Sequence, residues 1–453
     1  MVFNFYPRPA SKNSIVRDEL KETSTESLKT KNSADELVDY RDASAYTAHY
    51  VTHALLLDPQ KRLAGYRLAW LAVPGHEEVN VALQMKTLVT SAAKHFNAAD
   101  SGWSLGRNIL FFDVTADSLP LDALQSLPPE NVVLCLGLDD LTDAGTLPTL
   151  LFLREQGFGF MLCHAQALPK EPEVRGIITH FDVGTGDPDL VASIWREQAP
   201  GQAPGQRHLH LIATRMATWE GFDSCAARGV SVFVDGACAH PPVKARVSTL
   251  QPESLLIVQL MQMVRRDVDV RKIEALLKYD AVLSYRLLRY INSPAIGLRV
   301  EIHSLRHAVA MLGYSPLFRW LSSLLATSNT RACSPFMMQK AIMRGRFVEL
   351  MGEGMLTASD SDELFVVGML SLIDQLLGVS MEEALARVPL TEPVQQAILT
   401  RGGVYGPFLA LAETCERDGS HAARLSEALF MKASQVNAAH LSAMVWSQDM
   451  NPA

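Results

Sequence analysis

Five aspartates stand within or directly after short apolar runs, where the ends of strands could bring their carboxylates together. Carboxylate oxygens gathered in this way could hold a divalent metal ion. The same positions suit carboxylates that cap the helices following each strand, and this is the role we expect. No metal or other cofactor is therefore predicted at these residues, which are Asp113, Asp139, Asp140, Asp182 and Asp235.

Two further pairs of residues are of types that could carry chemistry. Cys163 and His164 could act as a nucleophile and its base, but neighbours on a strand point to opposite faces, which indicates a buried structural cysteine. His303 and His307 have the spacing of one helix face and could bind zinc. Ser304 as an N-cap would place His303 outside the helix, and no third ligand is evident. Neither pair indicates a catalytic or metal site.

The composition is typical of a soluble protein with more than one domain. The chain has 453 residues, too many for one ordinary domain. Its net charge of −8 argues against nonspecific binding to nucleic acid or to an anionic membrane. Its six cysteines form no CxxC pair, and no apolar run reaches the ~20 residues of a membrane span. We expect a cytoplasmic protein without a secretory signal, with residues 1–45 as a disordered N-terminal arm.

Residues 46–246 alternate between short apolar runs and helical stretches. The runs are predicted strands, and segments such as 79–96 and 147–156 are predicted helices. This alternation is typical of a parallel sheet covered by helices, and seven or eight units indicate a (β/α) barrel rather than an open sheet. The predicted strands lie within residues 55–58, 108–114, 131–138, 158–165, 176–183, 208–214 and 230–236.

Residues 250–448 show helical spacing throughout, most clearly between residues 273 and 313. Asp280 and Ser304 are predicted N-caps of two successive helices, and Ser315 is the predicted cap of a third. The all-helical pattern predicts a second domain with its own core. The residues expected to face that core include Leu287, Leu288, Ile291 and Met311.

This helical stretch resembles the HDOD domain, an all-helical regulatory module related to the HD phosphohydrolases. Where such hydrolases carry a metal-binding His-Asp doublet, this chain reads Ile373-Asp374, so the histidine is absent. The resemblance therefore implies a regulatory role. It rests on Asp280-Ala-Val-Leu, Leu287-Leu288, Ile291-Asn292-Ser293, Ile302-His-Ser304-Leu305, His307-Ala308 and Leu312-Gly313.

The barrel region resembles the EAL domain, through Leu63-Ala-Gly65-Tyr66, Leu153-Arg154 with Gly157-Phe158, and Ala213 through Trp219-Glu220. EAL domains are (β/α) barrels that cleave cyclic di-GMP with divalent metal ions, held by carboxylates and an Asn, and with a Lys near the phosphate. An EAL-like barrel followed by an HDOD domain is a known bacterial combination, so the two resemblances support each other.

Most of the EAL family's catalytic positions carry other residue types in this chain, and only Asp182 keeps a family carboxylate. Losing most metal ligands and the lysine would stop the reaction. The resemblance therefore implies an inactive barrel and a protein that is not an enzyme. The replacing residues are Arg67, Asp113, Cys135, Cys163, His164, His180, Thr214 and Asp235.

Together these observations predict a non-enzymatic signalling protein that acts through contacts with partner proteins, without nucleic acid or membrane. The candidate partner surface is formed by polar residues flanking the HDOD pattern, Arg299, Glu301 and Arg306.

Two alternatives stay open. The barrel could bind cyclic di-GMP without cleaving it, although Leu71 stands where the family has an arginine and His180 where it has a lysine, which weakens contacts to phosphate. Residues 304–325 could form a helix-turn-helix that binds DNA. The second helix of that segment offers only Arg319 as a cation and looks like a core helix.

Overall fold

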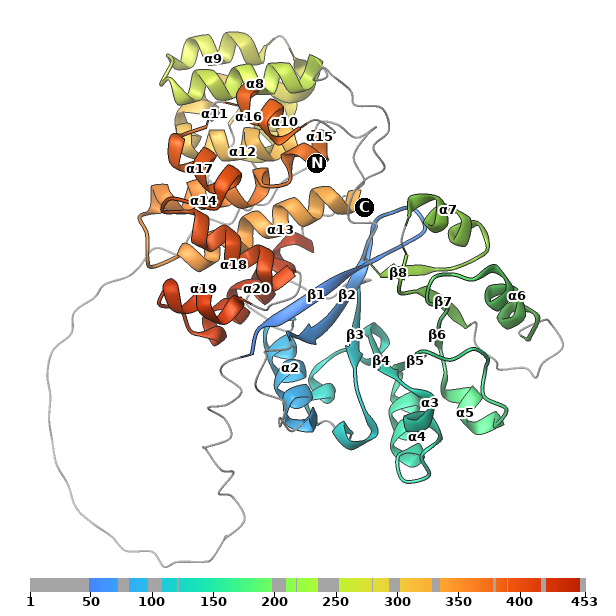
Figure 1. The fold of residues 1–453 in the computed structure, drawn as a ribbon. Coiled ribbons are helices and arrows are strands. Elements are labelled where there is room, and N and C mark those ends of the chain that lie inside the picture. Colours follow the sequence, from blue (N-terminus) through green and yellow to red (C-terminus); the bar gives the residue numbers. More distant parts are fainter. Residues whose placement is uncertain are drawn as a thin grey trace, which may run out of the picture.

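The computed structural model describes residues 49–71, 81–96, 108–119, 122–197, 209–216, 218–234, 252–278, 280–292, 302–327, 335–377, 380–388, 390–416 and 421–448. These ranges build a closed barrel of eight strands and a group of helices beside it (Figure 1). None of the helices in these ranges is both long and apolar enough to cross a membrane. The predicted arm, residues 1–45, lies outside the described residues.

The strands follow chain order around the barrel, but the first one runs against its neighbours. β1 pairs antiparallel with both β2 and β8, whereas all other neighbouring strands are parallel. The prediction of a parallel sheet is therefore wrong for β1, and β2 was not predicted as a strand. The cause is a tight turn in which Asp58 Oδ1 accepts hydrogen bonds from the N–H groups of Gln60 and Arg62 (2.9 Å each), so that β2 returns directly along β1. The strands are β1 (Val51–Leu57), β2 (Leu63–Trp70), β3 (Ile109–Asp113), β4 (Val132–Leu136), β5 (Gly159–Leu162), β6 (His180–Asp182), β7 (His210–Ala213) and β8 (Val232–Val234).

Helices and short 3-10 turns connect the strands. The predicted helix 147–156 matches α4 (Leu147–Gln156), which ends at Gly157 because that residue takes a left-handed φ of 111°. The predicted helix 79–96 corresponds to α2 (Val81–Phe96). The others are α3 (Leu138–Thr142), α5 (Pro172–Ile177), α6 (Pro188–Glu197) and α7 (Trp219–Ala227), with η2 (Ala116–Ser118), η3 (Asp122–Ser126) and η4 (Pro129–Asn131).

The inside of the barrel is a packed apolar core of its own. Inward-pointing side chains of most strands form a cluster separate from the core that lies outside the sheet. The interior is therefore filled rather than open, and polar groups gather at the carboxyl ends of the strands. The interior cluster consists of Leu56, Phe111, Val133, Cys135, Met161, Cys163, Ile212, Val232 and Val234.

The chain from residue 252 onward is helical in every described element. These are α8 (Pro252–Arg265), α9 (Val270–Leu277), α10 (Ala281–Ile291), α11 (Leu305–Leu312), α12 (Tyr314–Thr327), α13 (Pro335–Gly352), α14 (Ala358–Leu370), α15 (Ile373–Leu377), α16 (Met381–Arg387), α17 (Glu392–Thr400), α18 (Gly406–Glu416), α19 (Ala422–Ala428) and α20 (Ala433–Gln448).

Two predicted helix caps are present. Asp280 Oδ1 accepts a hydrogen bond from the N–H of Leu283 (2.9 Å) at the start of α10. Ser304 Oγ accepts one from the N–H of His307 at the start of α11. Leu287 in α10 is fully buried, as predicted. The local capping chemistry of this stretch was therefore readable in the sequence.

Three details of the helical prediction are wrong. α12 begins at Tyr314, so Ser315 lies in its first turn, and its hydroxyl donates to Asp362 (2.7 Å) instead of capping the helix. Met311 is 51 % exposed because it lies on the outer face of α11. The helical spacing of residues 363–377 predicts one helix, but the structure divides this stretch into α14 and α15 at Ser371.

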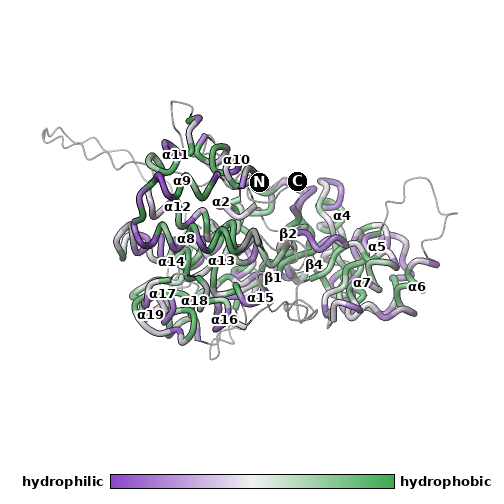
Figure 2. Tube along the Cα trace, turned by 90° about the horizontal axis from the view of Figure 1, so that it is seen from above, coloured by the Kyte–Doolittle hydropathy of each residue, from purple (hydrophilic) through white to green (hydrophobic). Residues whose placement is uncertain are grey.

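Side chains of α20 bind the backbone at the start of β1. Asn437 Oδ1 accepts from the N–H of Val51 (2.8 Å), and its Nδ2 donates to the carbonyl of His49 (2.8 Å). His440 Nδ1 donates to the carbonyl of Val51 (3.1 Å). The helical part thus satisfies backbone groups of β1 as a neighbouring strand would. Figure 2 shows β1 next to the helical part, near α13.

Candidate functional site

The carboxyl ends of the strands form the mouth of the barrel, and Arg67 and Asp113 make an ion pair there. Arg67 Nη2 lies 2.5 Å from Asp113 Oδ1, and Nε lies 3.1 Å from both carboxylate oxygens. Burial opposes the charge of Arg67, but Asp113 outweighs this and raises the pKa of Arg67. Asp113 was expected to cap a helix; instead it balances the charge of the arginine on the neighbouring strand.

The two cysteines at this end of the barrel are buried in its interior cluster. Burial raises the pKa of the Cys135 thiol well above its usual value, which keeps it protonated and unreactive. Cys163 is buried, whereas His164 is exposed with a left-handed φ of 58°. Cys163 and His164 therefore lie in different environments, in keeping with the predicted structural cysteine.

His180 is a buried, neutral imidazole. Burial, followed by the neighbouring His210 and Arg154, lowers the pKa of His180 to about 3. Its ring stacks on His210 with 5.0 Å between centroids and meets the Phe111 ring edge-on at 5.6 Å. An uncharged ring in this setting cannot supply the positive charge that a lysine would bring to a phosphate.

Asp182 holds two loops of the mouth together. Its Oδ1 accepts hydrogen bonds from the N–H of Gly184 (2.8 Å) and from the hydroxyl of Thr214 (2.7 Å). Asp140 bonds the loop after β3, because its Oδ1 accepts from the N–H of Ala116 at the start of η2 (2.9 Å). Asp235 lies outside the described residues.

These residues do not fit the divalent metal ion that an EAL-like barrel implies. Within the described ranges, no group of three His, Cys, Asp or Glu side chains is placed to hold a metal ion. The carboxylate of Asp113 is paired with the guanidinium of Arg67. The Oδ1 of Asp182 already accepts two hydrogen bonds, from the N–H of Gly184 and the hydroxyl of Thr214.

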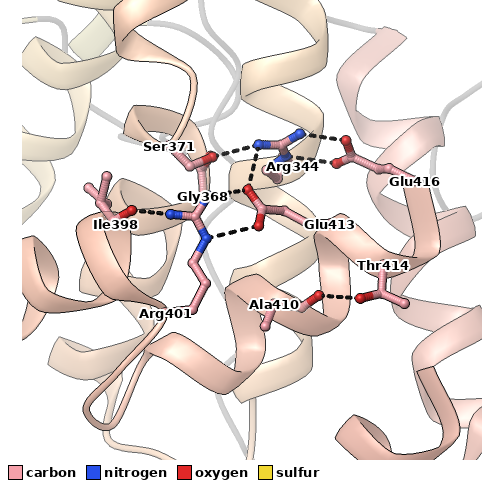
Figure 3. Close-up of polar contacts among 9 residues, drawn as sticks. All are labelled: Arg344, Gly368, Ser371, Ile398, Arg401, Ala410, Glu413, Thr414 and Glu416. Atoms are coloured by element: carbon pink, nitrogen blue, oxygen red, sulfur yellow. Dashed lines mark hydrogen bonds and ion pairs between the residues drawn. The ribbon is translucent and has the colours of Figure 1, made fainter. Parts of the chain in front are cut away.

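The helical part contains a buried ion-pair network that the sequence did not indicate (Figure 3). Arg344 of α13 makes two hydrogen bonds to Glu416 of α18 (2.8 and 2.6 Å) and one to Ser371 (2.8 Å). Arg401 makes two to Glu413 (2.9 and 2.6 Å). Burial opposes the charge of Glu416, but Arg344 outweighs it and lowers the pKa of Glu416 to about 2. The network joins α13, the end of α17 and α18, and its role is to hold these helices together.

The segment proposed as a helix-turn-helix forms α11 and α12, but α12 is a core helix. Trp320, Leu321 and Leu324 are each about 1 % exposed. Arg319 makes two hydrogen bonds to Glu349 of α13 (2.5 and 2.9 Å). A recognition helix needs an exposed face that can enter the major groove, which α12 does not offer.

The fold and the site together define a protein of two parts, a closed (β/α) barrel and an all-helical part bonded to its first strand. Residues 251–390 match the model of the HDOD domain family, so the helical part contains an HDOD domain. The prediction of an EAL-like barrel followed by an HDOD domain is confirmed at the level of architecture. The remaining helices, up to residue 448, lie beyond the matched range and their assignment to this domain stays a prediction.

Two curated proteins are similar in sequence. The cyclic di-GMP phosphodiesterase CdgJ of Vibrio cholerae serotype O1 is 28 % identical over 251 residues, which is 55 % of this chain and 58 % of that protein. The uncharacterized protein YuxH of Bacillus subtilis is 23 % identical over 218 residues, 48 % of this chain and 53 % of that protein. The chain spans about half the length of the curated relatives that it matches.

Solved structures of EAL domains are also similar. The EAL domain of Mycobacterium smegmatis DcpA is 14 % identical, with a TM-score of 0.30, and covers 41 % of this chain and 87 % of its own. The PaMucR phosphodiesterase in complex with cyclic di-GMP is 14 % identical, with a TM-score of 0.34, and covers 44 % of this chain and 94 % of its own. Similarity at this level transfers neither residues nor activity.

The prediction that this chain is not an enzyme is contradicted by its similarity to CdgJ, which is named as a phosphodiesterase. The prediction of an inactive barrel assumed that a catalytic group can come only from the positions that carry one in the EAL family. A barrel collects reactive groups from the ends of several strands, so replacement at single positions does not by itself exclude a reaction.

Proposed function

We propose that this protein is a cyclic di-GMP-responsive signalling protein whose helical part delivers the output through contacts with partner proteins. Cyclic di-GMP is the ligand because CdgJ, similar over 251 residues, is named for acting on it. The observation that carries the proposal is that one strand, β2, serves both parts of the molecule. Arg67 of β2 lies at the barrel mouth, and the preceding residue, Tyr66, donates a hydrogen bond to the carbonyl of Met444 in α20 (3.4 Å).

A ligand at the mouth can affect the helical part through this strand. Tyr66 is fully buried, and its ring meets the His53 ring edge-on at 6.1 Å. Successive residues of a strand point to opposite faces, so Arg67 faces the barrel mouth while Tyr66 faces α20. Because the two residues share one backbone, a ligand that shifts Arg67 also shifts Tyr66 against α20. Packed interfaces of this kind exchange between discrete arrangements, and a ligand that prefers one arrangement shifts the population toward it.

The proposed output surface is the outer face of the HDOD domain around α9 and α11. Its described member, Arg306, is exposed and held in place by Glu274 of α9 (2.7 Å). Glu274 also binds Lys278 (2.8 Å), so one carboxylate orients two surface cations. Arg299 and Glu301 of the predicted surface lie outside the described residues.

Isothermal titration of the full chain with cyclic di-GMP tests the proposal. We expect saturable binding, with GMP at equal concentration as the control that should give weaker heats. Chromatography of the same samples measures any product, so that binding and turnover are determined separately. No binding at a ligand concentration of about 100 µM, which corresponds to less than roughly 5.5 kcal/mol of affinity, would refute cyclic di-GMP as the signal.

A further inference from the structure

Arg215 is the second residue after β7 and lies over Gly184, the second residue after β6. A Cβ atom on Gly184 would come within 2.6 Å of Arg215 Nη2, and Gly184 has a left-handed φ of 57°. Only glycine leaves room for the guanidinium here and adopts this backbone conformation without strain. Both residues lie at the carboxyl ends of their strands, the end of a (β/α) barrel where ligands bind.

The backbone under Arg215 is fixed on both sides. The N–H groups of Thr214 and Arg215 both donate to the carbonyl of Gly184 (3.0 Å each). Asp182 Oδ1 accepts from the N–H of Gly184 and the hydroxyl of Thr214. The carboxylate that matches the EAL family thus joins the loops after β6 and β7 and sets where Arg215 stands.

No described neighbour balances the charge of Arg215. Its side chain is exposed and has no ion-pair or hydrogen-bond partner among the described residues. Arg67, at the same end of the barrel, is by contrast fully engaged with Asp113. A guanidinium held on a rigid base with its donors open is suited to a phosphate, which accepts two parallel hydrogen bonds from it.

We propose that Arg215 binds a phosphate group of the cyclic dinucleotide at the barrel mouth, with Asp182 as the residue that positions it. This assignment rests on the proposed function, because it takes cyclic di-GMP as the ligand. It also gives the mouth a phosphate contact that does not depend on His180, which is neutral, or on Leu71.

Titration of the full chain with cyclic di-GMP tests the assignment in two variants, each with a matched control. Arg215→Gln should weaken binding about tenfold or more, because a hydrogen-bonded charge is lost from a phosphate. Gly184→Ala should also weaken binding while keeping the charge, because the added methyl group displaces the guanidinium. The control Arg196→Gln changes an exposed arginine of α6, whose Nε binds the carbonyl of Ala192, and should bind as the unchanged protein does.

The matched control for the glycine variant is Gly176→Ala in α5, where an added Cβ would meet nothing within 4 Å. Binding by the unchanged protein together with equal binding by Arg215→Gln would overturn the assignment and leave the proposed function standing. No binding by the unchanged protein would overturn both. Weakened binding in Arg215→Gln and in both controls alike would also refute a specific role for Arg215.

Discussion

His53 of β1 and His440 of α20 face each other across the contact between the barrel and the helical part, with Nδ1 of His53 2.9 Å from Nε2 of His440. Burial lowers the pKa of both rings, so both are neutral; His440 Nδ1 donates to a backbone carbonyl, its Nε2 therefore accepts, and His53 Nδ1 donates to it. Protonation of both rings would place two N–H donors against each other. The contact between the two parts is therefore sensitive to protons.

Stability should fall as this pair takes up protons. Burial, followed by His440, lowers the pKa of His53 well below its usual range, and burial lowers that of His440 to about 4 although Glu416 opposes the shift. Lys340 and Arg344 also act against protonation of His53. In the folded protein the pKa values of both histidines lie below the unfolded value of roughly 6.5, so the unfolded chain takes up protons first as the pH falls. The contribution of the neutral pair to folding stability is therefore complete above about pH 6.5 and is lost as the pH falls toward 4.

We predict that the melting temperature of the full chain falls more steeply between pH 6.5 and 4.5 than that of a His440→Gln variant, as measured by circular dichroism. His307→Gln, which changes an exposed histidine of α11, should keep the slope of the unchanged protein. Parallel curves for all three proteins would show that the pair contributes nothing to the pH dependence.

Asn437→Ala should loosen the start of β1. The variant leaves the N–H of Val51 and the carbonyl of His49, just before β1, without their partner, at a cost of about 1–3 kcal/mol in the free energy of unfolding. Chemical denaturation measures this. Ser434→Ala, at an exposed position of the same helix, is the control and should change stability by less than about 0.5 kcal/mol. Equal effects of the two variants would mean that the hydrogen bonds of Asn437 to the backbone of Val51 and His49 do not stabilise the fold.

Leu287→Ala should lower the free energy of unfolding by about 2–5 kcal/mol, because Leu287 is fully buried in α10. Met311→Ala, at a residue that is half exposed, should cost less than about 1 kcal/mol. Urea denaturation of both variants gives the comparison. A cost below about 1 kcal/mol for Leu287→Ala would contradict its place in the core.

The sequence predicted what depends on local chemistry. The caps at Asp280 and Ser304 and the bounds of α4 follow from residues within a few positions of each other. The barrel followed from the repeated alternation of apolar runs and helices. The strand β2 was missed because Arg67 interrupts its apolar pattern.

Contacts between distant residues could not be predicted in this way. Arg67 and Asp113 lie 46 positions apart, and His53 and His440 lie 387 apart. The sequence indicated that Arg67 replaces a catalytic residue of the EAL family, but not that Asp113 would neutralise it. No local pattern reports that β1 is bound by the last helix, because this contact arises only when both parts have folded.

Hydrogen exchange of the full chain with and without cyclic di-GMP tests most directly whether a ligand at the barrel mouth reaches the helical part. We predict that saturating ligand changes amide protection in β2 near Arg67 and also in α20 around Asn437 and His440, which lie 370 and 373 positions after Arg67. Changed protection confined to the barrel, with α20 exchanging as in the free protein, would contradict the proposal that β2 carries the signal to the helical part.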